Sequence, residues 1–240
     1  PGPTPMRPVE PAAPERRRQA ITDVVRRTYH DPRVVARYLE LGLWPAEERL
    51  LRAYVAPGAR LLDVGCGAGR TSIPLALMGA RVTAIDLSEA MVAAARAAAR
   101  STGVRLDVRA MDACQLRFPD ASFDAALFSY NGIELLPGRG GKRRGLEELY
   151  RVLRPGGVLI FSTHSPFAVN RHAPGRLAGL VLALLARAGR RGGWELGERF
   201  RDDPNEEVRY LQILPASAWF AMLRAAGFVR VGFNTRRRLE

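Results

Sequence analysis

The feature that most constrains the fold is a glycine-rich turn between a short apolar run and a helical segment. Residues 61–64 are predicted to form a buried strand, which runs into the turn at 65–69 (Gly-Cys-Gly-Ala-Gly) and then into a helix over 71–78. Glycines in such a turn let the backbone approach a ligand closely, and the free N–H groups of a helix start attract an anion. The turn therefore predicts a nucleotide-cradling site on an α/β scaffold.

The alternation of strands and helices continues along the chain. Further short apolar runs are predicted as strands, at 82–85, 104–109, 125–129, 158–162, 208–214 and 228–233. Helices are predicted between them, at 89–100 with Ser88 as its N-cap, at 146–153 and at 216–226. This order predicts a Rossmann-like, doubly wound, mainly parallel seven-stranded sheet with helices on both faces. Right-handed crossovers place the ligand at the edge where the strands end.

The chain length and the positions of the prolines indicate one domain that follows an N-terminal tail. The 240 residues fit a single unit, and six prolines within the first 15 residues predict a flexible tail over 1–15. Residues 16–240 then form the domain. We divide it into an N-terminal helical cap (16–55), a cofactor-binding core (56–165), an insertion with an apolar helical run at 177–186 (166–205), and a C-terminal strand–helix–strand (206–240).

Two residues near the turn narrow the choice of nucleotide. Asp86 ends the next predicted strand, 21 positions after Gly65, where a carboxylate can accept both ribose hydroxyl protons. A dinucleotide fingerprint requires a small residue where this chain has Arg70, and the chain contains no Gly-Lys-Ser/Thr triplet of a P-loop. The common dinucleotide and triphosphate motifs are therefore excluded.

The turn resembles the cofactor-binding motif of class I S-adenosylmethionine-dependent methyltransferases. Residues 63–69 read Asp-x-Gly-x-Gly-x-Gly, and four further blocks resemble those of the family in the same order. These blocks are 85–88, 111–113, 118–124 and 151–157. The resemblance covers about residues 55–165, and it implies S-adenosyl-L-methionine as the cofactor and methyl transfer as the activity.

The resemblance also implies roles for individual residues. Gly65, Gly67 and Gly69, with Cys66 between them, would wrap the methionine part of the cofactor, and Asp63 would hold its amino group. Asp86, followed by Leu87, would bind the ribose. The remaining implied contacts are Asp112 with the adenine amino group, Met111 and Ala113 with its ring, Ser129 and Tyr130 with the sulfonium, and Tyr29 and Tyr38 over the cofactor. Core packing is an equal alternative for the last two tyrosines, and helix capping is an alternative for Asp86.

Methyl transfer from a sulfonium needs proximity, alignment and a dry site, and it needs a base when the nucleophile must lose a proton. His164 is the candidate base because it follows the fifth predicted strand, where the substrate should lie. A loop hydrogen bond is its alternative role. With three histidines and two cysteines without ligand spacing, Cys66 and Cys114, we expect no metal site.

The acceptor is less well defined by the sequence. Residues 129–132 read Ser-Tyr-Asn-Gly, where enzymes that methylate base amino groups usually carry Asp/Asn-Pro-Pro-aromatic. We expect a small, hydrophobic molecule that accepts the methyl group on O, N or C. Two alternatives stay open: an RNA methyltransferase that uses the basic tail and insertion, and a non-catalytic regulatory protein that binds the cofactor.

The net charge of +13 bears on partners. Such a charge can attract nucleic acid or an anionic membrane, and residues 171–191 would make a peripheral membrane contact. A mutational bias toward arginine explains the charge as well, because 36 of the 37 basic residues are arginine and only Lys142 is lysine. The few cysteines and the absence of a secretory signal predict a cytoplasmic protein. The sequence does not indicate an oligomeric state.

Overall fold

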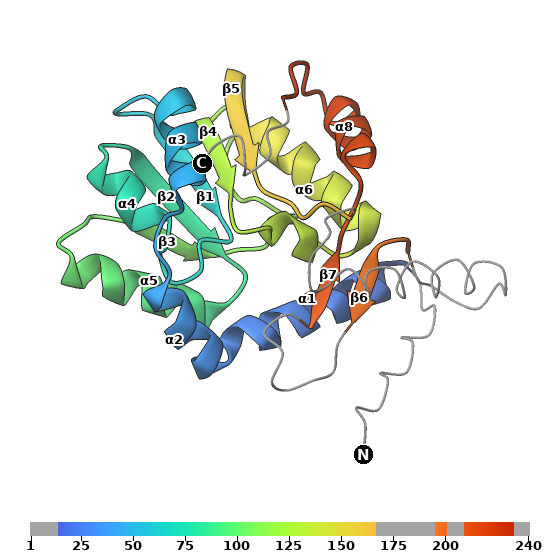
Figure 1. Ribbon diagram of the computed structural model, residues 1–240, viewed down its shortest axis with the longest axis horizontal. Coiled ribbons are helices and arrows are strands. Elements are labelled where there is room, and N and C mark those ends of the chain that lie inside the picture. The colour runs from blue at the N-terminus through green and yellow to red at the C-terminus, as the bar shows by residue number, and fades with distance from the viewer. Residues whose placement is uncertain (1–13, 167–194, 201–208, 233–240) are drawn as a thin grey trace, which may run out of the picture.

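The core of the protein is a five-stranded parallel sheet (Figure 1). A computed structural model describes residues 14–166, 195–200 and 209–232. The spatial order of the strands is β3 (Asp107–Ala110), β2 (Arg81–Asp86), β1 (Arg60–Val64), β4 (Phe123–Phe128) and β5 (Leu153–Phe161). Because all neighbouring pairs are parallel, the carboxyl ends of these strands meet at one edge.

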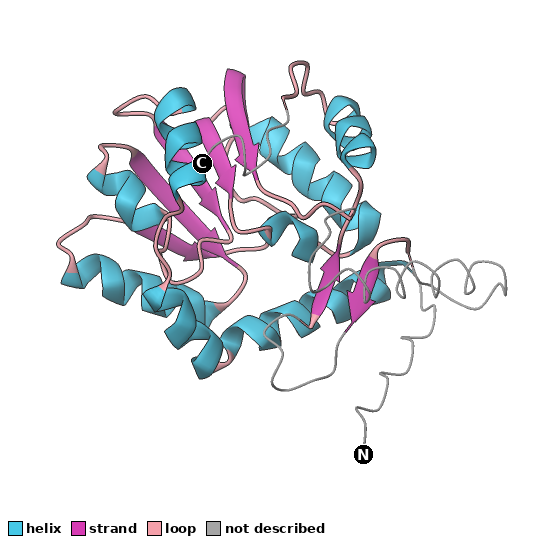
Figure 2. Ribbon diagram, viewed as in Figure 1, coloured by secondary structure: helices cyan, strands magenta, loops and turns pink. Residues whose placement is uncertain are grey.

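Helices cover both faces of this sheet (Figure 2). Leu61 of β1 packs with Leu51 and Leu75, which belong to α3 (Pro45–Tyr54) and α4 (Ser72–Leu77). On the same face, α5 (Glu89–Ser101) covers β2 and β3. The neighbouring Leu62 points the other way, toward α6 (Gly138–Val152) and α8 (Ala216–Ala225). The sheet is therefore doubly wound, as expected.

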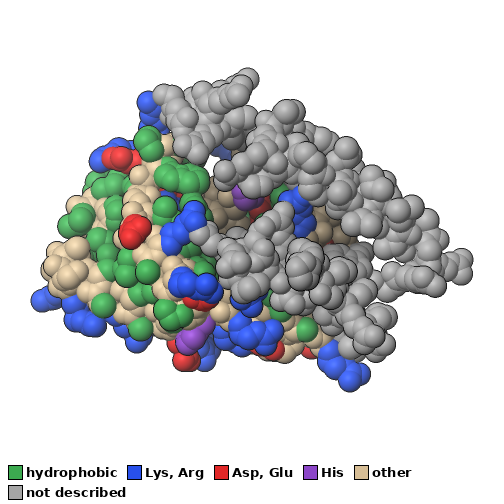
Figure 3. Space-filling view, turned by 60° about the horizontal axis from the view of Figure 1, so that its bottom comes forward, with side chains coloured by type: hydrophobic (Ala, Val, Ile, Leu, Met, Phe, Trp, Pro, Cys, Tyr) green, Lys and Arg blue, Asp and Glu red, His purple; other side chains and the backbone are tan. Residues whose placement is uncertain are grey.

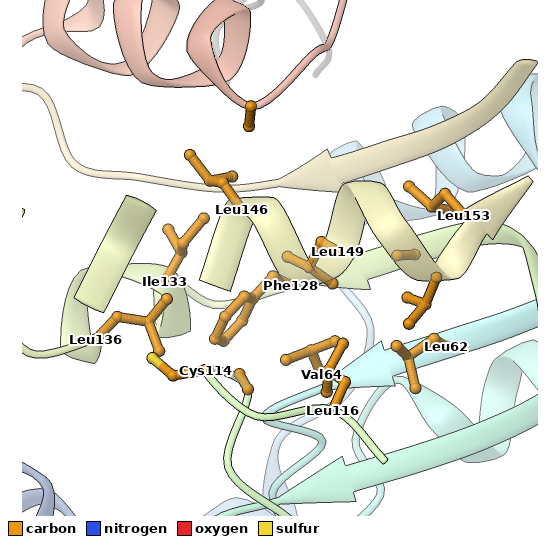
Figure 4. Packing of buried hydrophobic residues seen from close by; sticks show 14 of the residues in the cluster. Leu62, Val64, Cys114, Leu116, Phe128, Ile133, Leu136, Leu146, Leu149 and Leu153 are labelled. Carbon is orange, nitrogen blue, oxygen red and sulfur yellow. The ribbon is translucent and has the colours of Figure 1, made fainter. Parts of the chain in front are cut away.

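The larger core lies between the sheet and α6 (Figure 4). Leu62, Val64 and Phe128 project from the strands toward Leu146 and Leu149, which are fully buried on α6. Removing one such leucine side chain costs about 2–5 kcal/mol of folding free energy. This core holds the ends of β1 and β4, and with them the edge of the sheet that carries the site.

Helices at the N-terminal end of the described chain extend over that edge (Figure 1). α1 (Pro14–His30) begins inside the segment predicted to be a tail, and α2 (Pro32–Glu40) follows it directly. Asp31 caps α2 by accepting the Arg33 N–H, and Pro32 supplies a first-turn residue that needs no hydrogen bond. Ser88 caps α5 as predicted, by accepting the Met91 N–H.

The seven-stranded sheet is not confirmed. β7 (Tyr210–Gln212), predicted as the sixth strand, pairs instead with β6 (Glu198–Phe200) in a separate antiparallel ribbon. The ribbon packs against α1, where Tyr210 joins Ile21 and Val25 in a small apolar cluster. Residues 228–232, predicted within a last strand, form no strand. Their apolar pattern has another cause, because Phe228 and Val231 pack on the core beside α6.

Other predictions fall outside the described residues. These are the tail at 1–13 and, within the insertion, the apolar helix at 177–186 and the proposed membrane contact at 171–191. Among the residues that the structure describes, no helix is long and apolar enough to cross a membrane.

Candidate functional site

A pocket that is partly open to solvent lies where β1, β2 and β4 end. Most of the residues predicted to bind the cofactor line it, which brings together segments up to a hundred positions apart. They are Tyr29, Tyr38, Gly65, Gly67, Asp86, Leu87, Met111, Asp112, Ala113, Ser129 and Tyr130. Four predicted residues are not among those lining it: Asp63, Cys66, Gly69 and His164.

The glycine turn forms one wall of the pocket. Gly65 and Gly67 adopt φ values of +64° and +55°, a left-handed conformation that strains other residues. The Gly67 N–H donates a 2.9 Å hydrogen bond to Asp86 Oδ2. A Cβ added at Gly67 would lie 2.8 Å from the ring of Tyr38, so this position also needs glycine for lack of space.

Asp86 is held from both sides at the end of β2. Besides the Gly67 bond, its Oδ1 accepts the Ser88 N–H at 2.8 Å. Burial raises the pKa of Asp86 to about 6, and the two backbone hydrogen bonds counteract part of that rise. The carboxyl group therefore sits in a fixed orientation, and its ionisation is sensitive to mildly acidic pH.

Three predicted residues of the motif lie behind the pocket. Asp63 is fully buried, and its Oδ2 accepts hydroxyl bonds from Thr71 at 2.6 Å and from Ser72 at 2.5 Å at the start of α4. Within the described part of the chain its Oδ1 has no hydrogen-bond partner, and burial raises its pKa to about 6. Cys66 packs in the core under α5, and Gly69 lies beside Ile73.

α1 supplies a wall that sequence reasoning missed. Thr22, Val25 and Arg26 line the pocket together with the predicted Tyr29. Arg18 of the same helix lies 3.5 Å from Asp112 Oδ2. The spacing of Thr22, Val25 and Tyr29 puts them on one helix face, which was the available signal. The same pocket also includes the unpredicted residues Leu135, Leu136 and Pro137, just before α6.

A buried ion pair lies behind Ser129. Arg70, 6% exposed, makes two 2.8 Å bonds to the Glu47 carboxylate, so α3 is tied to the end of the glycine turn, just before α4. The Ser129 hydroxyl bonds both partners. Arg70, whose size excluded the dinucleotide motif, therefore fixes a residue that lines the pocket.

Aromatic rings continue this arrangement across the mouth of the pocket. Tyr38 contacts Tyr29 and Tyr130 edge-on, each with ring centroids 5.7 Å apart. Arg70 lies over the rings of Tyr130 and Trp44, at 5.0 and 5.6 Å. Tyr29 and Tyr38 thus pack against each other and also line the pocket.

His164 lies beside this pocket and contacts a carboxylate that the sequence did not single out. Its Nδ1 is 2.7 Å from Oε2 of Glu134, which is 1% exposed in the 3₁₀ helix η1 (Gly132–Leu135). Nothing in the local sequence marks Glu134, since the contact spans 30 positions. Among the described residues, no group of three or more His, Cys, Asp or Glu side chains is placed to hold a metal ion.

A second, open hollow lies at the corner between α1 and α2, and it contains none of the predicted site residues. It is lined mainly by basic side chains, Arg26, Arg27, His30 and Arg33, with Asp31 and Pro32. Figure 3 shows basic side chains on this side of the molecule, interspersed with acidic and apolar ones. The mixed character fits a solvated surface.

Comparison with known proteins agrees with the geometry. Residues 61–157 match the family model described as a methyltransferase domain. The chain is 34% identical over 184 residues to the demethylmenaquinone methyltransferase of Clavibacter sepedonicus, covering 74% of this chain and 69% of that one. It is also 34% identical to the phosphatidylethanolamine N-methyltransferase of Cereibacter sphaeroides, covering 70% and 80%. Several other methyltransferases match over about half of their own length.

A solved structure supports the same assignment. The SAM-dependent methyltransferase of Methanosarcina mazei aligns with a TM-score of 0.64 and 25% identity, covering 78% of this chain and 85% of that one. The chain therefore belongs to the class I S-adenosylmethionine-dependent methyltransferases, with S-adenosylmethionine as its cofactor.

Proposed function

We propose that the pocket holds S-adenosylmethionine beside a small, hydrophobic acceptor and that the protein transfers the methyl group to it. The observation that carries this proposal is the convergence of the glycine turn, Asp86 and the segment 111–113 on one pocket. S-adenosylmethionine, when bound, supplies an electrophilic methyl group on a sulfonium.

The residues present fit this cofactor. Asp86 lines the pocket with a carboxylate held by two backbone donors, so its remaining lone pairs can accept ribose hydroxyls. Gly65 and Gly67 leave room for the methionine part, and Met111 and Ala113 offer apolar contact to the adenine ring. Asp112 is oriented by the Cys114 N–H, at 2.8 Å from its Oδ1, for the adenine amino group.

Three further predicted residues have proposed roles around the reacting group. Ser129 and Tyr130 would lie next to the sulfonium, while Tyr38 would cover it. Their rigid setting, fixed by the Arg70–Glu47 pair, supports alignment of the methyl group and exclusion of water. The proposed role of Asp63 changes: its hydroxyl bonds indicate that it positions α4 and the turn from behind.

The walls of the pocket support a hydrophobic acceptor. Apolar side chains dominate the part not assigned to the cofactor, among them Val25, Phe128, Leu135 and Leu136. Two relatives that align over two thirds or more of both chains are named for demethylmenaquinone and phosphatidylethanolamine, which agrees with an apolar acceptor. In the described lining, one arginine stands against two aspartates, which disfavours RNA as the substrate.

A methyl-transfer assay tests the proposal. The full chain is incubated with tritiated S-adenosylmethionine and a bacterial extract separated into organic-soluble, aqueous small-molecule and RNA fractions. We expect label in the organic-soluble fraction and none with Asp86→Asn. Label in the RNA fraction would favour the RNA alternative instead. Cofactor binding by calorimetry without transfer to any fraction would favour a regulatory protein.

A further inference from the structure

In the described parts of the chain, one buried carboxylate, that of Glu134, contacts both the backbone and the ring of His164. Glu134 Oε1 accepts the His164 backbone N–H at 2.7 Å and the Thr163 hydroxyl at 2.5 Å, while Oε2 lies 2.7 Å from His164 Nδ1. Glu134 is 1% exposed at its side chain, whereas the ring of His164 is half exposed. A buried acceptor thus holds a ring that remains accessible.

We propose that Glu134 and His164 form a proton-accepting pair and that the methyl acceptor is therefore a hydroxyl group, such as a phenol or an enol. This inference rests on the proposed function. His164 would be the catalytic residue, and Glu134 a positioning residue that acts through it.

The contact with Glu134 determines which nitrogen of His164 can accept a proton. Glu134 Oε1 already accepts the Thr163 hydroxyl and the His164 N–H, and a carboxylate oxygen can only accept, so the 2.7 Å contact of Oε2 places the hydrogen of the neutral ring on Nδ1. The lone pair is then on Nε2. Asn131 Nδ2 lies 3.3 Å from Nε2, and an amide N–H pointing there is consistent with an unprotonated Nε2. This tautomer is the one that general base catalysis requires.

The backbone around Asn131 places the pair at the edge of the cofactor pocket. Tyr130 and Gly132, on either side of Asn131, line that pocket. Tyr130 and Asn131 have φ values of +50° and +59°, a left-handed conformation that is costly for residues other than glycine. The Asn131 N–H is fixed by a 2.9 Å bond to the Ser162 hydroxyl, so the chain leaving β4 is joined to the chain leaving β5.

A buried cation supports η1 from below. Lys142 is fully buried, and its Nζ donates to the backbone carbonyls of Glu134 and Leu136 at 3.1 and 2.7 Å. Burial lowers the pKa of Lys142 to about 7, although nearby carboxylates, first among them Glu134, oppose the shift. The carbonyl bonds hold the short helix that carries the Glu134 carboxylate.

The pair matters for a hydroxyl acceptor because a neutral hydroxyl is a weak nucleophile. In the proposed step the O–H proton moves to His164 Nε2 while the oxygen forms its bond to the methyl carbon and the carbon–sulfur bond breaks. The products are a methyl ether, S-adenosylhomocysteine and an imidazolium that Glu134 stabilises, and the proton then passes to water. A neutral amine attacks with its own lone pair and needs no base before bond formation.

The first test reads the tautomer and needs no substrate. Long-range ¹H–¹⁵N spectra of the full chain labelled on histidine are assigned with His164→Ala. We expect hydrogen on Nδ1 in the wild type and a shift toward Nε2–H in Glu134→Gln, whose amide can donate to Nδ1. A wild-type His164 with hydrogen on Nε2 overturns the proposal, since that nitrogen could not accept a proton.

The second test uses methyl transfer to shape-matched acceptors, 2-naphthol and 2-naphthylamine, and to the organic-soluble extract. We expect His164→Ala to lower the turnover of oxygen methylation about a hundredfold or more, with cofactor Kd within about twofold, and added imidazole to restore part of it. Glu134→Gln should lower turnover about tenfold or more, because the tautomer is wrong for the base. His30→Ala, at the exposed corner between α1 and α2, is the matched control and should be unchanged.

The outcomes separate this inference from the proposed function. If the wild type methylates these acceptors or the extract and His164→Ala retains full turnover, the pair is refuted while the methyltransferase function stands. Transfer confined to nitrogen refutes the hydroxyl acceptor. If the wild type transfers no label at all, the proposed function fails, and the tautomer measurement still decides whether the pair exists as described.

Discussion

The two halves of the pocket edge are built in different ways. On the side of β1 and β2, glycines and backbone N–H groups shape the site, and the link between Gly67 and Asp86 spans 19 positions. On the side of β4 and β5, side chains do so, and the link between Glu134 and His164 spans 30. In the proposed function the first half, which we call the donor half, holds the methyl donor. The second, which we call the acceptor half, carries the proposed base pair, and it depends on the fold to bring its parts together.

The halves also differ in where they place backbone strain. The left-handed residues of the donor half are Gly65, Gly67 and Gly69, for which this conformation carries little cost. In the acceptor half they are Tyr130 and Asn131, for which the conformation carries a cost that is smaller at asparagine than at tyrosine. Strain that persists at a pocket wall is characteristic of positions with a functional constraint.

The largest expected effect is loss of donor binding in Asp86→Ala. The change removes an ionised acceptor for two ribose hydroxyls, each bond worth about 1.5–3 kcal/mol, so S-adenosylmethionine should bind at least about a hundredfold more weakly. Titration calorimetry measures this directly. The His164 tautomer in the same variant should be unchanged, and a changed tautomer would show that the two halves are coupled.

The next effect concerns the shape of the glycine turn. Gly67→Ala should weaken cofactor binding about tenfold, because alanine is strained at φ +55° and its methyl group would push the Tyr38 ring into the pocket. Gly140→Ala is the matched control, since a Cβ there meets nothing within 4 Å. Equal affinities for the two variants would remove the steric argument for the turn.

The pH dependence of S-adenosylmethionine binding should also arise in the donor half, from the ionisation of Asp86. Burial raises the pKa of Asp86 to about 6, and the ribose hydroxyls need the ionised form. Affinity should therefore hold above pH 7 and decline as the pH falls through about 6, with a loss of about tenfold at pH 5. Calorimetry between pH 5 and 8 checks the sign. Asp86→Asn should bind weakly with a flat profile, and a steep profile in that variant would assign the titration to another group.

The smallest expected effect is a gain of stability in the acceptor half. Asn131→Gly relieves the left-handed strain at φ +59° and should raise the free energy of unfolding by up to about 1 kcal/mol. Urea denaturation measures it, with Asn131→Ala as the control that removes the amide without relieving the backbone. If glycine stabilises no more than alanine, strain does not distinguish this half.

The sequence predicted which segments of the donor half meet at one pocket, because each of them lies at a strand end. The turn, Asp86 and the segment 111–113 each follow a strand end, and parallel strands bring those ends together. Glu134 could not be found in this way, since its role depends on the pairing of β4 with β5 and on the bond between Asn131 and Ser162. The wall formed by α1 depends on tertiary packing for the same reason.

The fold differed from expectation where apolar pattern alone was used. Phe228 and Val231 show the spacing of a short buried segment, but their partners are the core and α6 rather than a strand. Tyr210 joins the cluster on α1, and its hydroxyl bonds Glu198 and the Gly138 N–H. Burial can be inferred from such patterns, whereas the surface against which a residue is buried cannot.

The burial of Lys142 makes the chain unusual as a target for amine chemistry. It is the only lysine among the 240 residues, and it is fully enclosed beneath η1. An acylating reagent therefore meets no exposed side-chain amine on the folded protein. Burial is what lowers the pKa of Lys142 to about 7, so an opening that uncovers the amine also returns its pKa toward the ordinary value of a lysine, and acylation is then measured at alkaline pH. The rate of acylation at Lys142 would report how often the structure around η1 opens. Mass spectrometry of the single peptide that contains Lys142 measures this rate.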